Sequence, residues 1–194
     1  MKTIVFYGSP ARQGQTKDLL DELLAELEGE IKFVDCYHAN IAPCKDCRYC
    51  FTKRGCAIQD GMQELYDDID CCDAVVIATP MHFGIMSAPV FSVFTRLQSY
   101  WSNRNIRHND TDRPNPKYGA LLVTTGGKWV NMELLIQGVS AFAFDHMEAE
   151  CIGTVFAYQT DTHPVKDNDR VKEKARYLGY RLRELCREKS QSKG

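Results

Sequence analysis

Four cysteines in one short segment have a spacing suited to binding iron. Cys44, Cys47, Cys50 and Cys56 form the pattern C-x2-C-x2-C-x5-C. Four thiolates can hold a [4Fe-4S] cluster, and bacterial ferredoxins wrap such a cluster with a C-x2-C-x2-C triple, although their fourth ligand lies elsewhere. Structural zinc sites usually use two C-x2-C pairs with a longer stretch between them. The pattern therefore favours an iron-sulfur cluster, with zinc and free thiols as the alternatives.

The segment that carries these cysteines is long for a connection between a strand and a helix. Residues 37–60 span 24 positions, whereas such connections usually take about 2 to 6 residues. A long connection of this kind usually has a function. The chain contains nine cysteines in all. We expect the other five to pack as small apolar side chains: Cys36, Cys71, Cys72, Cys151 and Cys186.

A polar turn near the N-terminus could bind a phosphate group. Residues 8–16 read Gly-Ser-Pro-Ala-Arg-Gln-Gly-Gln-Thr, between an apolar run and a helical pattern. The hydroxyl groups of Ser9 and Thr16 can donate to phosphate oxygens, and the start of a helix offers unpaired N–H groups. The turn matches neither the dinucleotide fingerprint G-x-G-x-x-G nor the pattern G-x-x-x-x-G-K-S/T. It therefore predicts a cradle for one phosphate, with an ordinary capped turn as the alternative.

Two further loops could hold a flat, aromatic ligand. Residues 79–84 and 124–129 each follow a predicted strand and contain glycine. Their backbone amides, their glycines and the neighbouring apolar side chains suit a heterocycle such as a flavin. The alternative is a pair of ordinary turns, with Phe83 and Trp129 in the core and His82 as a hydrogen-bonded structural residue.

An alternation of strands and helices must position these segments. Apolar and β-branched runs predict five strands, at residues 2–7, 31–36, 73–79, 117–125 and 148–156. Apolar stripes with helical spacing predict helices at residues 16–29, 86–101, 130–144 and 171–185. The alternation indicates a single α/β domain over residues 1–194, a three-layer sandwich on a five-stranded parallel sheet. Ligands in such sheets bind beyond the carboxyl ends of the strands, where the four segments described above are expected.

The connection at residues 99–117 is basic and rich in asparagine. It contains Arg104, Arg107, Arg113 and Lys117, and we expect a solvated, irregular loop. A site for a nucleotide or an acidic partner, a subunit contact and an active-site lid are the alternatives.

Composition excludes several classes of function. The 194 residues carry a formal charge of −2 and no broad excess of basic side chains, so we expect no nucleic acid partner and no anionic membrane partner. No apolar run approaches the roughly 18 residues of a membrane helix. The first apolar run breaks at residues 8–10, too early for a signal peptide. We therefore expect a cytoplasmic protein.

In these motifs the sequence resembles the NADPH-dependent FMN reductase and iron-sulfur flavoprotein group of the flavodoxin-like superfamily. The resemblance implies that Ser9, Gln15 and Thr16 hold the phosphate of FMN. Ala11 replaces the arginine that is usual after the proline, which makes Arg12 the candidate for its charge. Flavin contacts are implied for two loops, at Pro80, Met81, His82, Phe83, Gly84, Thr125, Gly126 and Gly127.

The same resemblance extends to the cysteine segment and to assembly. In iron-sulfur flavoproteins a compact four-cysteine motif carries a [4Fe-4S] cluster beside FMN, and the family is typically dimeric or a dimer of dimers. A homodimer or homotetramer is therefore expected. The sequence departs from the family pattern at His82, where tyrosine is common, and this residue is a candidate proton donor near the flavin. It also departs at residues 59–62, which lack the usual paired acids.

Four functions are compatible with these features. The first is an FMN-dependent NAD(P)H oxidoreductase that carries FMN and a [4Fe-4S] cluster and serves a small-molecule or protein redox partner. The second is a cluster-free NAD(P)H-dependent quinone, azo or flavin reductase. The third is an electron carrier or redox sensor, although a charge of −2 gives little support to an acidic docking surface. The fourth is an interaction protein held together by zinc.

Overall fold

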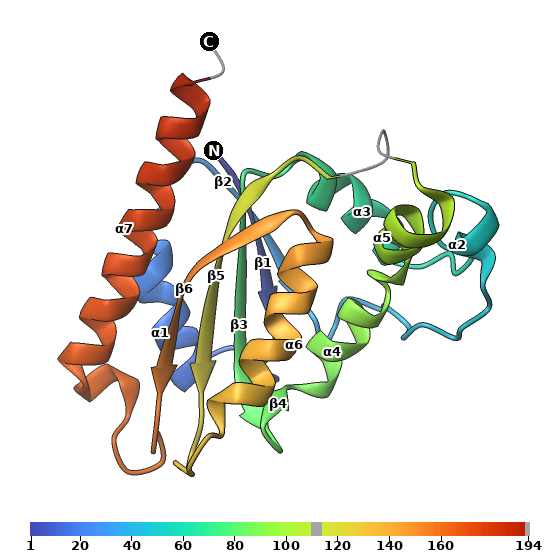
Figure 1. Ribbon diagram of the computed structural model, residues 1–194. Coiled ribbons are helices and arrows are strands. Elements are labelled where there is room, and N and C mark those ends of the chain that lie inside the picture. Colours follow the sequence, from blue (N-terminus) through green and yellow to red (C-terminus); the bar gives the residue numbers. More distant parts are fainter. Residues whose placement is uncertain (110–113, 193–194) are drawn as a thin grey trace.

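The computed structural model describes residues 1–109 and 114–192, and Figure 1 shows its sheet with helices on both faces. The strands are β1 (Lys2–Tyr7), β2 (Glu30–Asp35), β3 (Ala74–His82), β4 (Ile85–Met86), β5 (Lys117–Thr124) and β6 (Ala149–Ala157). The α-helices are α1 (Gln15–Leu24), α2 (Tyr49–Thr52), α3 (Met62–Cys71), α4 (Ala88–Thr95), α5 (Gln98–Ser102), α6 (Glu133–His146) and α7 (Asp169–Gln191). A π-helix, η1 (Asn103–Arg107), and a 3-10 helix, η3 (Val165–Asp167), complete the elements. In the described part of the chain, no helix is long and apolar enough to cross a membrane.

Five of the strands form a parallel sheet in the order β2-β1-β3-β5-β6. The order reverses direction at β1, as in doubly wound sheets, and the helices cover both faces. The short strand β4 adds an antiparallel pair to the end of β3. The predicted fold class, a three-layer α/β sandwich with a five-stranded parallel sheet, is confirmed.

The core is divided by the sheet, as strand β1 illustrates. Ile4 and Phe6 are fully buried among side chains of α3, α4 and α6. Val5 and Tyr7 point to the opposite face and pack against side chains of α1 and α7. Successive side chains of a strand point to opposite faces, so a run buried on both sides reads as continuously apolar. Because the strand is apolar on both faces, a layer of helices is needed on each face of the sheet.

The predicted helix at residues 86–101 is wrong as a single element. It begins at Ala88 and ends at Thr95, and α5 follows after a break at Arg96 and Leu97. At the break the backbone N–H groups of Arg96 and Leu97 bond three residues back, to Val93 and Phe94, in a tightened turn. The Arg96 carbonyl also accepts a hydrogen bond from the hydroxyl of Tyr66, at 2.9 Å. A side chain from α3 therefore competes with regular helix bonding at this position.

In the described residues, the first part of the basic connection is helical, in α5 and η1, rather than an irregular loop. Arg104 lies in η1 and forms ion pairs with Asp145, at 2.6 Å, and Glu148, at 2.7 Å. Lys117 is buried at the start of β5, where its Nζ donates to the carbonyl of Met147. Both side chains are therefore bound by the end of α6 and the residues directly after it, which the sequence pattern did not indicate. Arg107 also lies in η1. Arg113, the remaining basic residue of the connection, lies outside the described residues.

Candidate functional site

The four predicted ligand cysteines come together. Cys44, Cys47, Cys50 and Cys56 all line one small pocket, beside the break between α4 and α5. Two left-handed residues turn the chain between successive cysteines: Asp46 has a φ of 49° and Arg48 has a φ of 59°. All four cysteine side chains thereby reach the same pocket. The structure thus agrees with the grouping that the spacing predicted.

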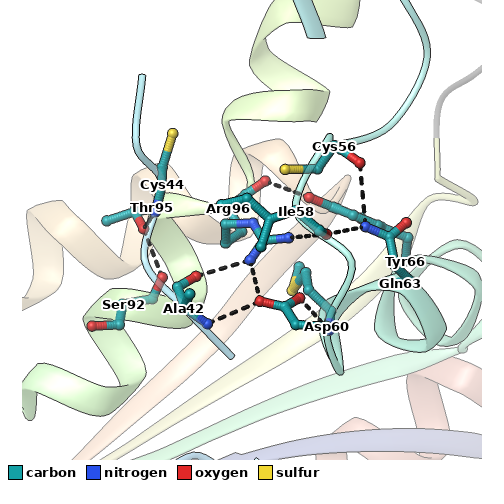
Figure 2. A network of polar contacts seen from close by, with 11 residues as sticks. Ala42, Cys44, Cys56, Ile58, Asp60, Gln63, Tyr66, Ser92, Thr95 and Arg96 are labelled. Carbon is teal, nitrogen blue, oxygen red and sulfur yellow. Dashed lines mark hydrogen bonds and ion pairs between the residues drawn. The ribbon is translucent and has the colours of Figure 1, made fainter. Parts of the chain in front are cut away.

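Hydrogen bonds fix the cysteine segment against the helices behind it. The N–H of Cys44 donates to Oγ1 of Thr95 at 2.9 Å, and Thr95 in turn donates to the carbonyl of Ser92 (Figure 2). The Sγ of Cys50 lies 3.2 Å from Oγ of Ser102. The N–H of Asp46 donates to Sγ of Cys44 at 3.4 Å. N–H donors to cysteine sulfur are one of the means by which proteins tune iron-sulfur clusters.

Four cysteine thiols around one pocket are a donor set of soft ligands, which suits an iron-sulfur cluster or zinc. Among residues 1–109 and 114–192, no group of three or more His, Cys, Asp or Glu side chains is placed to hold one metal ion. A zinc ion draws four thiolates to about 2.3 Å from one centre. In a four-iron cluster each thiolate binds a different iron, so the sulfur atoms stand further apart. The choice between the two metal centres stays a prediction from the cysteine spacing.

The other five cysteines divide into two groups. Cys36, Cys72 and Cys186 are buried, as predicted, and burial raises the pKa of Cys72 to about 11. Cys71 and Cys151 are exposed, so the prediction that they pack in the core is wrong. Cys71 is the last residue of α3, and Cys151 lies on β6, the edge strand of the sheet.

A second hollow, called the flavin cleft after the ligand that the resemblance implies, opens beyond the carboxyl ends of β3 and β5. Its volume is about 730 Å³. Six of the predicted flavin-contacting residues line it: Met81, Phe83, Gly84, Thr125, Gly126 and Gly127. Two other predicted residues, Pro80 and His82, are not among the described residues that line the cleft. Both belong to β3, which is longer than the strand predicted at residues 73–79.

The longer strand ends in a hairpin that exposes an aromatic ring. Met81 pairs with Met86 and His82 pairs with Ile85, which leaves a two-residue turn at Phe83 and Gly84. The φ angles of the turn residues are 51° and 82°, and such turns match the twist of paired strands. The ring of Phe83 is fully exposed, and the ring of Trp129 is 67% exposed. The alternative that placed both rings in the core is therefore wrong.

Three lining residues of the cleft were absent from the predicted set. They are Trp129, Met132 and Asp161. Trp129 lies two residues after Gly127, and a Cβ at Gly127 would lie 2.3 Å from its ring, so glycine permits this close approach. Asp161 lies beyond the carboxyl end of β6, and its carboxylate would lie 2.4 Å from a Cβ at Gly126. The rule that ligands bind beyond strand ends also applies to β6, and it could have pointed to Asp161.

The predicted phosphate turn leads into α1 and is linked to its neighbours. Gly14 precedes the helix with a φ of 132°, a conformation that favours glycine. Oγ1 of Thr16 lies 2.7 Å from Oγ1 of Thr124, and Oε1 of Gln15 accepts the N–H of Val165 at 2.7 Å. The side chains of Gln15 and Thr16, two of the four predicted phosphate ligands, thus already have protein partners. The unpaired N–H groups of the first helical turn are the clearest donors for a phosphate.

Ser9 and Arg12 are the other two predicted phosphate ligands of this turn. The side chain of Ser9 accepts the N–H of Ala11 at 3.3 Å, which shapes the turn. Arg12 is exposed to solvent. The donor set therefore has the chemistry for an anion, and the roles of Ser9, Arg12, Gln15 and Thr16 toward a phosphate stay predictions.

Comparisons with known proteins agree with this geometry. The family model described as NADPH-dependent FMN reductase matches residues 1–163. An iron-sulfur flavoprotein from Archaeoglobus fulgidus is 33% identical over 138 residues, which cover 70% of this chain and 67% of that protein.

Solved structures with low sequence identity share the fold. The structure of RosB with bound 8-demethyl-8-formylriboflavin-5'-phosphate has a TM-score of 0.71 at 13% identity, covering 98% of this chain and 81% of that one. A flavone reductase has a TM-score of 0.67 at 16% identity; the match covers 96% of this chain but only 63% of the reductase. The family match, the iron-sulfur flavoprotein relative and the shared flavodoxin-like fold confirm the resemblance read from the motifs, and the chain belongs to the NADPH-dependent FMN reductase family.

Proposed function

We propose that this protein is an FMN-dependent oxidoreductase in which Cys44, Cys47, Cys50 and Cys56 hold a [4Fe-4S] cluster. One observation carries the proposal: the four cysteines line a single pocket. When bound, FMN takes up electrons in pairs and the cluster passes them singly, with NAD(P)H as the expected donor and a small molecule or protein as the partner. The relative named iron-sulfur flavoprotein supports this pairing of cofactors.

The chain's own residues give the flavin cleft a rigid floor. The N–H of Thr125 donates to the carbonyl of Ala157 at 2.9 Å, and the N–H of Gly127 donates to Oγ1 of Thr125 at 3.3 Å. These bonds hold the glycine loop in place before any ligand binds. A preorganised loop lowers the entropy cost of binding a flat ring. The solved structure with a riboflavin-phosphate derivative supports FMN as the ligand.

Helix α4 connects the flavin cleft with the cysteine pocket. Its first turn follows Ser87, which is hydrogen-bonded through its N–H to Thr79 on β3. Its last residue, Thr95, accepts the N–H of Cys44. Eight helical residues rise about 12 Å. Helix α4 thus joins strand β3, whose end borders the cleft, to the cysteine segment.

Reduction of the protein without oxygen tests the function. NADPH or NADH is added, and flavin absorbance and the electron paramagnetic resonance (EPR) spectrum are recorded. We expect bleaching of the flavin band and a signal of a reduced four-iron cluster. If a strong chemical reductant produces no cluster signal, the cluster proposal is wrong. If neither nucleotide bleaches the flavin, NAD(P)H is not the donor.

A cluster-free quinone, azo or flavin reductase is the second candidate. The observation that favours it is the wide cleft with Phe83 and Trp129 exposed at its rim, which suits a flat aromatic acceptor stacked over the flavin. The Cys50→Ser variant separates the two functions. If it reduces quinones with NAD(P)H as fast as the unmodified protein, the cluster is not needed for turnover and the second candidate is favoured.

We further propose a homodimer formed through α6 and the turn before it, with a homotetramer as the alternative. Val130, Leu134, Leu135 and Phe142 are each more than 60% exposed, an unusual concentration of apolar side chains on a surface. Leu135 lies 3.3 Å from the position of a Cβ on Gly84, so this surface borders the flavin cleft. A partner subunit seated there would cover the rim of the cleft.

A further inference from the structure

A fully buried arginine lies beneath the cysteine pocket. The side chain of Arg96 has no exposed surface, although it carries a positive charge. Burying a charge is costly unless it is paired and hydrogen-bonded. Arg96 stands at the break between α4 and α5, and it lines the same pocket as the four cysteines. An uncommon charge at this place calls for a role connected with the pocket.

The guanidinium group of Arg96 joins the two ends of the cysteine segment. One terminal nitrogen donates to the carbonyl of Ala42 at 2.8 Å, and the other donates to the carbonyl of Ile58 at 3.1 Å (Figure 2). Ala42 lies two residues before Cys44, and Ile58 lies two residues after Cys56. One planar group therefore fixes the distance between the beginning and the end of the segment.

Asp60 completes the connection as the counter-ion. Its Oδ2 accepts from Arg96 at 2.7 Å and from the N–H of Ala42 at 2.9 Å, and its Oδ1 accepts from the N–H of Met62 at 3.1 Å. Burial raises the pKa of Asp60, but these hydrogen bonds outweigh burial and hold the pKa below its ordinary value. The carboxylate therefore stays ionised. The pair has a charge-assisted geometry that is stronger than a neutral hydrogen bond.

Helix α3 supports the same connection from the other side. Nε2 of Gln63 donates to the carbonyl of Ile58 at 2.6 Å and to the carbonyl of Cys56 at 3.3 Å (Figure 2). The hydroxyl of Tyr66 donates to the carbonyl of Arg96. These contacts hold the backbone around the fourth cysteine and hold Arg96 itself.

One donor of Arg96 is left over. Its Nε is buried and has no hydrogen-bond partner among the residues that the structure describes. Buried donors without a partner are rare and call for an explanation. Cys56 lines the same pocket as Arg96. The cysteine sulfur atoms of the pocket are hydrogen-bond acceptors, and Nε of Arg96 lacks an acceptor.

We propose that Arg96 is a positioning residue for the iron-sulfur cluster: it sets the spacing of Cys44 and Cys56 and neutralises the buried carboxylate of Asp60 beside the pocket. The inference rests on the proposed function, because it concerns the same four cysteines. Without Arg96 the Asp60 carboxylate would lose its counter-ion, and an unpaired negative charge nearby disfavours the reduced, more negative state of a cluster and lowers its reduction potential. Arg96 thus acts on both the retention and the potential of the cluster.

Two substitutions separate geometry from charge. Arg96→Lys keeps the charge but loses the planar fork, so one point donor replaces three bonds. Arg96→Met removes both. Arg183→Met serves as the matched control, because Arg183 also donates to a backbone carbonyl and pairs with glutamates, but on α7 across the sheet. All variants are purified without oxygen, and FMN and iron are measured per chain.

Three readouts are expected to change with Arg96. Hydrogen exchange of residues 41–60 becomes about tenfold faster or more in both Arg96 variants, since bonds to a charged group are lost. Bleaching of cluster absorbance in air becomes about fivefold faster or more. The cluster potential, titrated by EPR, falls in Arg96→Met and stays near the original value in Arg96→Lys. FMN content and the control variant remain unchanged.

The outcomes distinguish failure of the inference from failure of the proposed function. An Arg96→Met protein with unmodified iron content, potential and hydrogen exchange overturns the inference. If Arg96→Met does not fold, Arg96→Lys decides: unchanged exchange and bleaching rates overturn it. If the unmodified protein binds no iron even after anaerobic reconstitution, the proposed function fails. Exchange of residues 41–60 in the iron-free variants then still decides whether Arg96 positions the segment.

Discussion

At the scale of single residues, the spacing predicted that four cysteines group together, whereas the burial of the other cysteines was predicted less well. The four clustered cysteines share one pocket because C-x2-C repeats bring successive side chains to one side of a curled segment. The left-handed conformations of Asp46 and Arg48, which produce the curl, have no clear signature in the sequence. Arg96 was missed for a related reason, because a buried cation depends on partners far away in the chain. In this structure the most distant of them, Ala42, lies 54 residues away.

Serine substitutions test the cysteine ligands one at a time. Cys47→Ser and Cys50→Ser are expected to lose most of their iron and sulfide, because an alcohol is a much poorer iron ligand than a thiolate. FMN content should stay at one per chain. Cys151→Ser is the control, since Cys151 is exposed like Cys47 but lies on β6, outside the pocket. Equal iron content in all three variants would contradict the assignment.

Thr16 offers a second residue-scale test, because its hydroxyl is shared with Thr124. Thr16→Val and Thr124→Val each remove one partner of the same buried bond, at a cost of about 1 kcal/mol in the free energy of unfolding. If Thr16 also contacts the phosphate, Thr16→Val weakens FMN binding several-fold more than Thr124→Val. FMN dissociation constants measured by fluorescence quenching compare them. Equal weakening would mean that the hydroxyl of Thr16 has only a structural role.

At the scale of elements, the sequence predicted which segments are strands and helices better than it predicted their ends. The five parallel strands follow from their apolar runs. The extension of β3 to His82 could not be read from periodicity, because the extra residues are held by pairing with β4. The break at Arg96 depends on Tyr66 of α3, a contact between elements. Contacts between elements thus determine where β3 and α4 end, next to the two candidate sites.

The junction of β1, β3 and α4 is predicted to require glycine at residue 8. A Cβ there would lie 2.3 Å from Cγ2 of Val90 and 2.7 Å from Oγ of Ser87. Gly8→Ala should therefore lower the free energy of unfolding by about 1–3 kcal/mol, as overpacking does, and should weaken FMN binding by displacing the phosphate turn. Urea unfolding and FMN titration measure both effects.

A glycine with free space is the matched control for that substitution. A Cβ on Gly138, in α6, meets no atom within 4 Å. Because Gly138 shares a helix face with Leu134 and Leu135 of the proposed dimer surface, the substitution is made in the Leu135→Glu variant. There Gly138→Ala is expected to leave stability unchanged or to raise it by up to about 1 kcal/mol, since alanine is the better helix former. Equal destabilisation by the two substitutions would show that close packing at residue 8 is not the cause.

Asp68 connects α3 to the first two strands and predicts a pH dependence. It pairs with Lys2 at 2.7 Å and with Lys32 at 3.1 Å. Burial raises the pKa of Asp68, but its bonds to the two lysines outweigh burial and keep the pKa below the ordinary aspartate value. The resulting stabilisation is complete above about pH 4 and is lost as pH falls through the lower pKa of the folded state.

The Asp68→Asn variant lacks this titration. The difference in free energy of unfolding between the unmodified protein and the variant should therefore be largest near pH 7 and shrink below about pH 4. Urea unfolding followed by circular dichroism, in a series from pH 7 downward, measures this difference. A difference that stays constant or grows on acidification would refute the assignment.

At the scale of the whole molecule, topology brings the predicted segments to one end of the sheet. The carboxyl ends of parallel strands meet at one edge, so the glycine loops after β3 and β5 line one cleft, as predicted. Asp161 beyond β6 joins them, although it was not predicted. The cysteine segment forms its own pocket beside α4 and α5 instead of joining the cleft. This separation depends on the packing of the segment against Thr95 and Ser102, which lie far away in sequence.

The proposed dimer makes a prediction about assembly. Leu135→Glu places a charge within the exposed apolar surface of α6, where it should be tolerated in a monomer and disrupt a dimer. Light scattering should then show a dimer for the unmodified protein and a monomer for the variant. Gln137→Glu, also exposed on α6, is the control. A monomeric unmodified protein would remove the basis for this interface.

The most direct test of the central claim is the cofactor content of protein purified without oxygen. FMN, iron, acid-labile sulfide and zinc are each measured per chain. The account predicts about one FMN with about four iron and four sulfide, and no stoichiometric zinc. One FMN without iron or sulfide would contradict the cluster and favour the cluster-free reductase. One zinc per chain without FMN would contradict the account as a whole.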